Sequence, residues 1–261
     1  MLNTKKIKII IVEGISELQF LHFLTQHFCQ LFCIKPLVET EQKHPMIEKI
    51  QGKIKNIYSC QEKSLIALDF MSKYNITVEK ISDILSIISE KNIGMEFEIL
   101  IIIDNDEDYI KTEKDFKNII EKLKNEVKKS QQDLDISEQY QLKSIQTLTL
   151  PNETSTGCLE SLIIEICPKE DLQCFDLLIN CVKELPSAKI PNDNLIAKLK
   201  LNHYNTFFND EDKKNVSTSI ANILKNTQKK YEKDKKDFLS HIKQNKNIAN
   251  IIAKISTFID Q

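Results

Sequence analysis

Two continuous apolar segments rich in β-branched residues dominate the hydrophobic pattern of this chain. Lys8–Val12 ends abruptly at Glu13, and Phe97–Ile103 ends at Asp104. Unbroken apolar runs of this length predict strands that are buried on both faces, which is typical of a parallel sheet. A third segment, Ser144–Leu150, alternates apolar and polar residues and predicts another strand.

Helical periodicity fills much of the chain between these strands. Apolar residues recur at helical spacing after Ser16, as far as Phe32, and again over Val78–Ser89 and Asp115–Val127. Leu159–Ile166 predicts a shorter helix before Pro168. Strands that alternate with helices predict an α/β fold, here a parallel sheet with helices on both faces. Weaker strand candidates are Ile34–Val38 and Ile54–Tyr58.

The pattern changes after residue 165, where it becomes helical only. Ile248–Ile259, for example, repeats apolar residues at helical spacing. The chain shows no internal repeat and no Gly/Ser-rich linker. We therefore expect an α/β core over residues 1–165 and a helical extension over residues 166–261 that packs on it.

Composition narrows the classes of protein that this chain can be. With 41% apolar residues, 28% charged residues and a net charge of −2, the chain is neither disordered nor a general polyanion-coating protein. No apolar run can span a bilayer, and Ile7–Val12 is too short for a signal peptide. The seven cysteines include no CxxC pair, so we expect a cytoplasmic protein.

Every basic residue is a lysine, because the chain contains no arginine. The bidentate guanidinium group is therefore absent, and phosphate has to be bound by lysine, backbone N–H groups or a metal ion.

Acidic residues follow the predicted buried strands. In parallel α/β sheets, ligands bind beyond the carboxyl ends of the strands. The first strand leads to Glu13, and the most apolar strand leads to Asp104 and Asp106. A third acid, Glu160, follows Gly157 at a predicted helix start. Carboxylates from separate segments repel each other unless a divalent cation lies among them, so the pattern predicts a Mg²⁺ or Mn²⁺ site.

The same acids also have simpler interpretations. Acids after a strand are often solvated or lie at a helix N-terminus. For Glu160, a position in the first turn of a helix is as good an interpretation as a metal ligand. An EF-hand is excluded because its sixth position, which needs glycine, is Tyr109. A haloacid-dehalogenase motif needs Thr or Val where this chain has Asp108.

The motifs VEGISE (12–17) and IIIDNDED (101–108) resemble the two signature motifs of the Toprim (topoisomerase–primase) domain. TGCLESL (156–162) is similar to OLD-family nucleases and to small stand-alone Toprim-like proteins. The resemblance covers roughly residues 5–165. It implies a Mg²⁺- or Mn²⁺-dependent phosphoryl-transfer site, with Glu13, Asp104 and Asp106 as catalytic and metal-binding residues. Glu17, Asp108 and Glu160 would complete a second metal site.

The chain lacks the further parts of the larger Toprim proteins. It shows no tyrosine-bearing DNA-breaking domain, no zinc module and no G-x-x-x-x-G-K-[ST] motif for an ATPase. We therefore expect a metal-dependent nuclease. The alternatives are a catalytically inert Toprim-like module that binds nucleic acid or a partner protein, and a small-molecule phosphotransferase or phosphatase. Self-association is compatible with each of these.

One segment, Lys225–Lys246, carries eight lysines and three acids. Such a segment is usually the solvated face of a helix, and the alternative is a surface that contacts the phosphates of a nucleic acid. The candidates for phosphate contact are Lys225, Lys229, Lys230, Lys233, Lys235 and Lys236.

Overall fold

The structure is a computed structural model, and it describes residues 6–29, 35–36, 56–60, 64–89, 94–105, 109–132, 140–152, 157–184, 192–208, 220–234 and 237–260. The described strands form a six-stranded sheet in the order β2-β3-β4-β1-β5-β6. Strands β4, β1, β5 and β6 are parallel, whereas β3 is antiparallel to β4 and β2 is antiparallel to β3. The strands are β1 (Lys6–Val12), β2 (Lys35–Pro36), β3 (Asn56–Cys60), β4 (Leu65–Asp69), β5 (Met95–Asp104) and β6 (Tyr140–Leu150).

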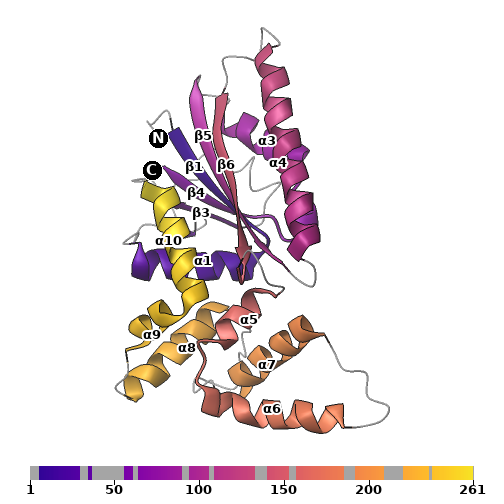
Figure 1. Cartoon of the computed structure of the whole chain (residues 1–261). Helices are drawn as coiled ribbons and strands as arrows, with labels where there is room; N and C mark the ends of the chain where they lie inside the picture. Colours follow the sequence, from indigo (N-terminus) through magenta and orange to yellow (C-terminus); the bar gives the residue numbers. More distant parts are fainter. Residues whose placement is uncertain are drawn as a thin grey trace.

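Helices cover both faces of this sheet, which confirms the α/β fold (Figure 1). Helices α3 and α4 lie on one face, and α1 and α10 lie on the other, while α5 to α9 lie beyond the carboxyl ends of the parallel strands (Figure 1). The helices are α1 (Ile15–Phe28), η2 (Lys73–Asn75), α3 (Val78–Ser89), α4 (Tyr109–Gln132), α5 (Leu159–Ile164), α6 (Lys169–Lys183), α7 (Asp193–Phe208), α8 (Ile220–Lys233), α9 (Phe238–Gln244) and α10 (Lys246–Asp260).

The central strand β1 shows why most of its residues are apolar. Ile10 and Val12 pack into the hydrophobic cluster on the α1 and α10 side. Ile9 and Ile11 pack into the second cluster, with α3 and α4. Successive side chains of a strand point to opposite faces, so burial of both faces requires apolar residues at each of these positions.

Several sequence-based boundaries need correction. Strand β4 was not predicted, although each of its residues is buried. Helix α1 ends at Phe28 with Cys29 as its C-cap, and the rest of the predicted helix, as far as Phe32, lies outside the described residues. The helix α4 is longer than the predicted Asp115–Val127.

Strands β1 and β5 are neighbours whose following helices lie on opposite faces of the sheet. Helix α1 follows β1 on one face, and α4 follows β5 on the other. This arrangement leaves space at the carboxyl ends of the two strands, which is where open α/β sheets bind ligands. Glu13 and Asp104 lie at these two strand ends.

The helices after residue 165 share a core with the sheet. A single hydrophobic cluster contains Ile10 and Leu148 from strands and Leu201, Leu224 and Ile255 from helices α7, α8 and α10. The extension is thus packed on the α/β core, while the exact boundary at residue 165 stays a prediction.

Candidate functional site

Glu13 and Asp104 are brought together by the pairing of β1 with β5. Val12, the last residue of β1, is in register with Ile102, two residues before the end of β5 at Asp104. The backbone N–H of Asp104 donates a hydrogen bond to Glu13 Oε2 over 3.3 Å. The two acids that the sequence placed at separate strand ends are therefore direct neighbours.

The segment after β6 contributes the next carboxylate. Asp104 Oδ1 accepts a hydrogen bond of 3.1 Å from the backbone N–H of Leu159, the first residue of α5. Potential ligand atoms of Asp104, Cys158 and Glu160 all lie within 4.8 Å of one another. Asp104 is buried, and Glu160 is half-buried in the first turn of α5.

Glu17 completes the cluster from the first turn of α1. Its side chain is buried, and burial is the largest cause that raises the pKa of this carboxyl to about 7. The Glu13 and Glu160 carboxylates raise the pKa of Glu17 further, while the backbone N–H groups of Glu17 and Gly14 act in the opposite direction. Glu13 and Glu160 therefore both lie close enough to Glu17 to influence its ionisation.

Two glycines allow the backbone to approach this cluster closely. A Cβ atom at Gly14 would lie 3.0 Å from Glu17 Oε2. Gly157 has a φ of +145°, and a Cβ atom there would lie 2.9 Å from Pro151 Cδ. A side chain at Gly14 would push the Glu17 carboxylate aside, whereas one at Gly157 would strain the backbone that leads to Cys158 and Glu160.

Cys158 was not among the predicted site residues. Its thiol is buried, and burial together with the nearby Glu160 and Asp104 carboxylates raises its pKa to about 12. The thiol therefore stays protonated at neutral pH. Its position between Gly157 and the helix that begins at Leu159 is the sequence signal that could have identified it.

The structure brings together four of the six predicted metal ligands: Glu13, Glu17, Asp104 and Glu160. The other two, Asp106 and Asp108, lie outside the described residues. The oxygen-rich donor set suits a hard cation such as Mg²⁺ or Mn²⁺, whereas a thiol ligand suits softer metals.

Comparisons with protein families, curated proteins and solved structures found no match. No helix in the described part of the chain is long and apolar enough to cross a membrane. Information on the function of the site therefore comes from the residues of the site.

The predicted nucleic-acid-binding lysines fall into three groups. Lys225, Lys229 and Lys233 are exposed along one side of α8. Lys230 forms an ion pair with the buried Asp171 of α6, so its charge already has a structural partner. Lys235 and Lys236 lie outside the described residues.

Proposed function

We propose that this protein is a metal-dependent nuclease that hydrolyses phosphodiester bonds of nucleic acid at the carboxylate cluster. The observation that carries the proposal is the convergence of Glu13, Asp104 and Glu160, from three separate chain segments, with the buried Glu17. Carboxylates held this close are costly to keep ionised without a cation. Their place at the sheet's switch point is a second support, because this is where α/β sheets bind ligands.

The residues of the cluster have different roles in this proposal. Asp104 and Glu160 hold the divalent ion, because their ligand atoms lie within 4.8 Å of each other. Glu13, which is half-buried, adds a further carboxylate beside Asp104. A bound Mg²⁺ or Mn²⁺ would supply an activated water molecule and neutralise charge on the phosphate. Glu17, whose pKa is raised to about 7 by burial and its acidic neighbours, can hold a proton at neutral pH.

The first prediction tests the metal site. Mg²⁺ or Mn²⁺ at ten times its dissociation constant stabilises the protein by about 1.4 kcal/mol, which corresponds to a rise in Tm of about 2–4 °C. Asp104→Asn should reduce this rise and should also raise the Tm of the metal-free protein, because it relieves repulsion within the cluster. Thermal unfolding in chelator and in metal measures both effects.

Glu170→Gln is the matched control, because Glu170 is an exposed acid in the first turn of α6. It should leave the metal-induced rise unchanged. If the Tm of the wild type responds to neither ion and Asp104→Asn leaves the metal-free Tm unchanged, the metal site is wrong.

The second prediction tests the chemistry. Glu13→Gln and Asp106→Ala should each abolish Mn²⁺-dependent cleavage of DNA and RNA oligonucleotides, because each removes a carboxylate that the proposal needs. Loss of one such group is expected to lower the rate by at least about 100-fold. Circular dichroism should show an intact fold in both variants. Equal cleavage by the wild type, both variants and Glu170→Gln would point to a contaminating nuclease.

A further inference from the structure

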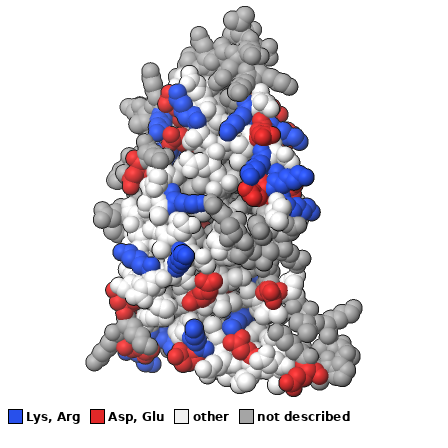
Figure 2. Space-filling model, viewed as in Figure 1, with Lys and Arg blue, Asp and Glu red and all other residues white. Residues whose placement is uncertain are grey.

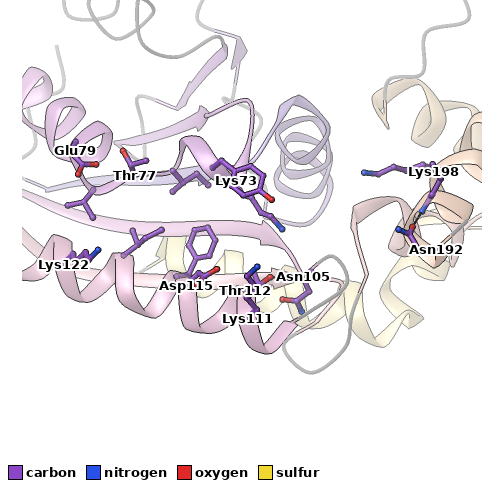
Figure 3. A pocket seen from close by; sticks show the side chains of 16 residues that line it. Lys73, Thr77, Glu79, Asn105, Lys111, Thr112, Asp115, Lys122, Asn192 and Lys198 are labelled. Atoms are coloured by element: carbon purple, nitrogen blue, oxygen red, sulfur yellow. Dashed lines mark hydrogen bonds between the residues drawn. The ribbon is translucent and has the colours of Figure 1, made fainter.

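A cavity of about 1000 Å³ is lined by residues of both the α/β core and the helical extension. Its walls come from η2 and the start of α3, from α4 and from the start of α7 (Figure 3). Asn105, the residue directly after Asp104, also lines it. A ligand in this cavity could therefore contact the residue that follows Asp104.

The charged side chains that line this cavity are predominantly basic. Four lysines, Lys73, Lys111, Lys122 and Lys198, stand against two acids, Glu79 and Asp115. Lys73 and Lys198 point toward each other across the space, and Lys111 points into it from α4 (Figure 3). On the face of the molecule drawn in Figure 2, by contrast, described lysines and acids are interspersed. The cavity thus concentrates positive charge from three separate elements in a chain whose net charge is −2.

The cavity also has an aromatic wall. Tyr74 lines it and is 83% exposed, and the Nζ atom of Lys73 lies 6.0 Å from the centre of its ring. Leu195 of α7 adds a second exposed apolar side chain. An exposed aromatic ring beside lysines is the combination with which proteins bind single strands, because the ring stacks on a base while the lysines contact phosphates.

We propose that this cavity binds single-stranded nucleic acid and leads it to the carboxylate cluster. Lys73, Lys111 and Lys198 contact successive phosphates, and Tyr74 stacks on an unpaired base. A single strand is favoured over a duplex because the bases of a duplex are stacked on each other and leave no face open to Tyr74. The inference rests on the proposed function and names the form of its substrate. It also moves the main phosphate contacts from α8, where the sequence placed them, to the cavity.

The test compares two triple variants that remove the same charge. Lys73, Lys111 and Lys198 are replaced by Gln in the first, and the exposed α8 residues Lys225, Lys229 and Lys233 are replaced by Gln in the second. Fluorescence anisotropy measures binding of a labelled single-stranded oligonucleotide about ten nucleotides long, of DNA and of RNA, in chelator and at several salt concentrations. The first variant should bind at least about tenfold more weakly, with the log–log salt slope reduced by roughly 0.7 per lost contact. The second should bind within about twofold of the wild type.

Tyr74 gives an independent test of stacking. Tyr74→Ala should weaken binding roughly tenfold, while Tyr74→Phe, which keeps the ring, should bind like the wild type. Tyr74→Ala should leave the affinity for a duplex of the same length unchanged. If the duplex binds as tightly as the single strand, or if inorganic phosphate at equal phosphate concentration displaces the strand completely, the single-strand assignment is wrong.

The remaining outcomes separate this inference from the proposed function. All binding is repeated with Asp104→Asn, so that no cleavage is needed for a signal. If the wild type binds the strand without cleaving it and the first triple variant binds more weakly, the cavity is retained as a binding site and the nuclease activity is rejected. If the first triple variant cleaves like the wild type, or if binding is lost only in the α8 variant, the cavity is rejected as the binding site. The proposed nuclease activity is not affected by either result. Absence of any binding by the wild type would also reject the cavity as a binding site.

Discussion

At the scale of single residues, Glu17 is a carboxyl whose protonation depends strongly on its surroundings. It is buried in the first turn of α1, close to the carboxylates of Glu13 and Glu160. Burial and these two neighbours raise its pKa from 4.5 to about 7. In an unfolded chain the same group would lose its proton near its ordinary pKa. Protonation of this residue is therefore coupled to folding.

The third prediction concerns the pH dependence of stability. Between about pH 4.5 and pH 7 the folded state holds the Glu17 proton and the unfolded state does not, so the free energy of unfolding falls as the pH rises through this range. Above pH 7 the full cost of ionising the buried Glu17 carboxyl is reached, and it lowers the free energy of unfolding by up to about 3 kcal/mol. Glu17→Gln removes it, so this variant should gain stability over the wild type as the pH rises. Urea unfolding in chelator at about pH 5 and pH 8 measures the difference.

Two comparisons test whether the pH dependence of stability arises from Glu17. Glu170→Gln, at an exposed position, should show no pH-dependent gain. Saturating Mg²⁺ should shrink the gain, because a cation favours the ionised carboxylate. A difference between Glu17→Gln and the wild type that is the same at both pH values would contradict the assigned environment of Glu17.

The site residues differ in how far the sequence could predict them. Glu13 and Asp104 follow the two most apolar strands, and parallel pairing necessarily brings such strand ends to one edge. Cys158 could not be predicted in the same way, because a cysteine among apolar residues is usually a core residue. Its place beside Asp104 depends on the hydrogen bond between Leu159 and Asp104, which joins residues distant in the sequence.

At the scale of the elements, β1 contains an uncommon residue for a buried strand. Lys8 is 6% exposed, and its Nζ donates a hydrogen bond of 2.7 Å to the backbone carbonyl of Ile259, at the end of α10. The last carbonyl groups of a helix have no partner within the helix and carry partial negative charge. This hydrogen bond from Lys8 thus links α10 to the central strand β1.

The fourth prediction follows from this contact. Lys8→Met keeps the length of the side chain but removes the charged donor, and should lower the free energy of unfolding by about 1–3 kcal/mol. Lys6→Met is the matched control on the same strand, because Lys6 is 37% exposed and pairs with Glu98 at 3.0 Å. An exposed ion pair of this kind contributes about 0–1 kcal/mol. A Lys8→Met variant as stable as the wild type would mean that the cost of burying the ammonium group offsets the hydrogen bond.

Elements were predictable where one local signal was strong. The period of Val78–Ser89 gave helix α3 with its observed bounds. By contrast, the sequence predicted the first helix after Ser16, but α1 begins at Ile15 and has no side-chain cap. Gln19 Oε1 accepts a hydrogen bond from the Ala221 N–H. Strand β4 is a short apolar run of the kind that helices and strands share, and its pairing with β1 decides its structure.

At the scale of the whole molecule, the helical extension closes one side of the proposed substrate cavity. Lys198 and Leu195 come from α7, whereas Lys73 and Lys111 come from the α/β core. The sequence could not predict this juxtaposition, because it depends on how α5 and α7 pack beyond the sheet. The same packing joins the two parts of the chain in one hydrophobic cluster. Stability of the extension and geometry of the cavity should therefore be linked.

The fifth prediction tests this linkage through a core residue of the extension. Leu224 of α8 is 1% exposed and belongs to the cluster that also contains Ile10 and Leu148 of the sheet. Leu224→Ala should lower the free energy of unfolding by about 2–5 kcal/mol. Because the core is shared, calorimetry should show one unfolding transition that shifts as a whole, with equal calorimetric and van't Hoff enthalpies. Leu178→Ala is the control, since Leu178 of α6 is 56% exposed and should change stability by at most about 0.5 kcal/mol. Two transitions, of which Leu224→Ala shifts only one, would show that the extension folds independently of the sheet.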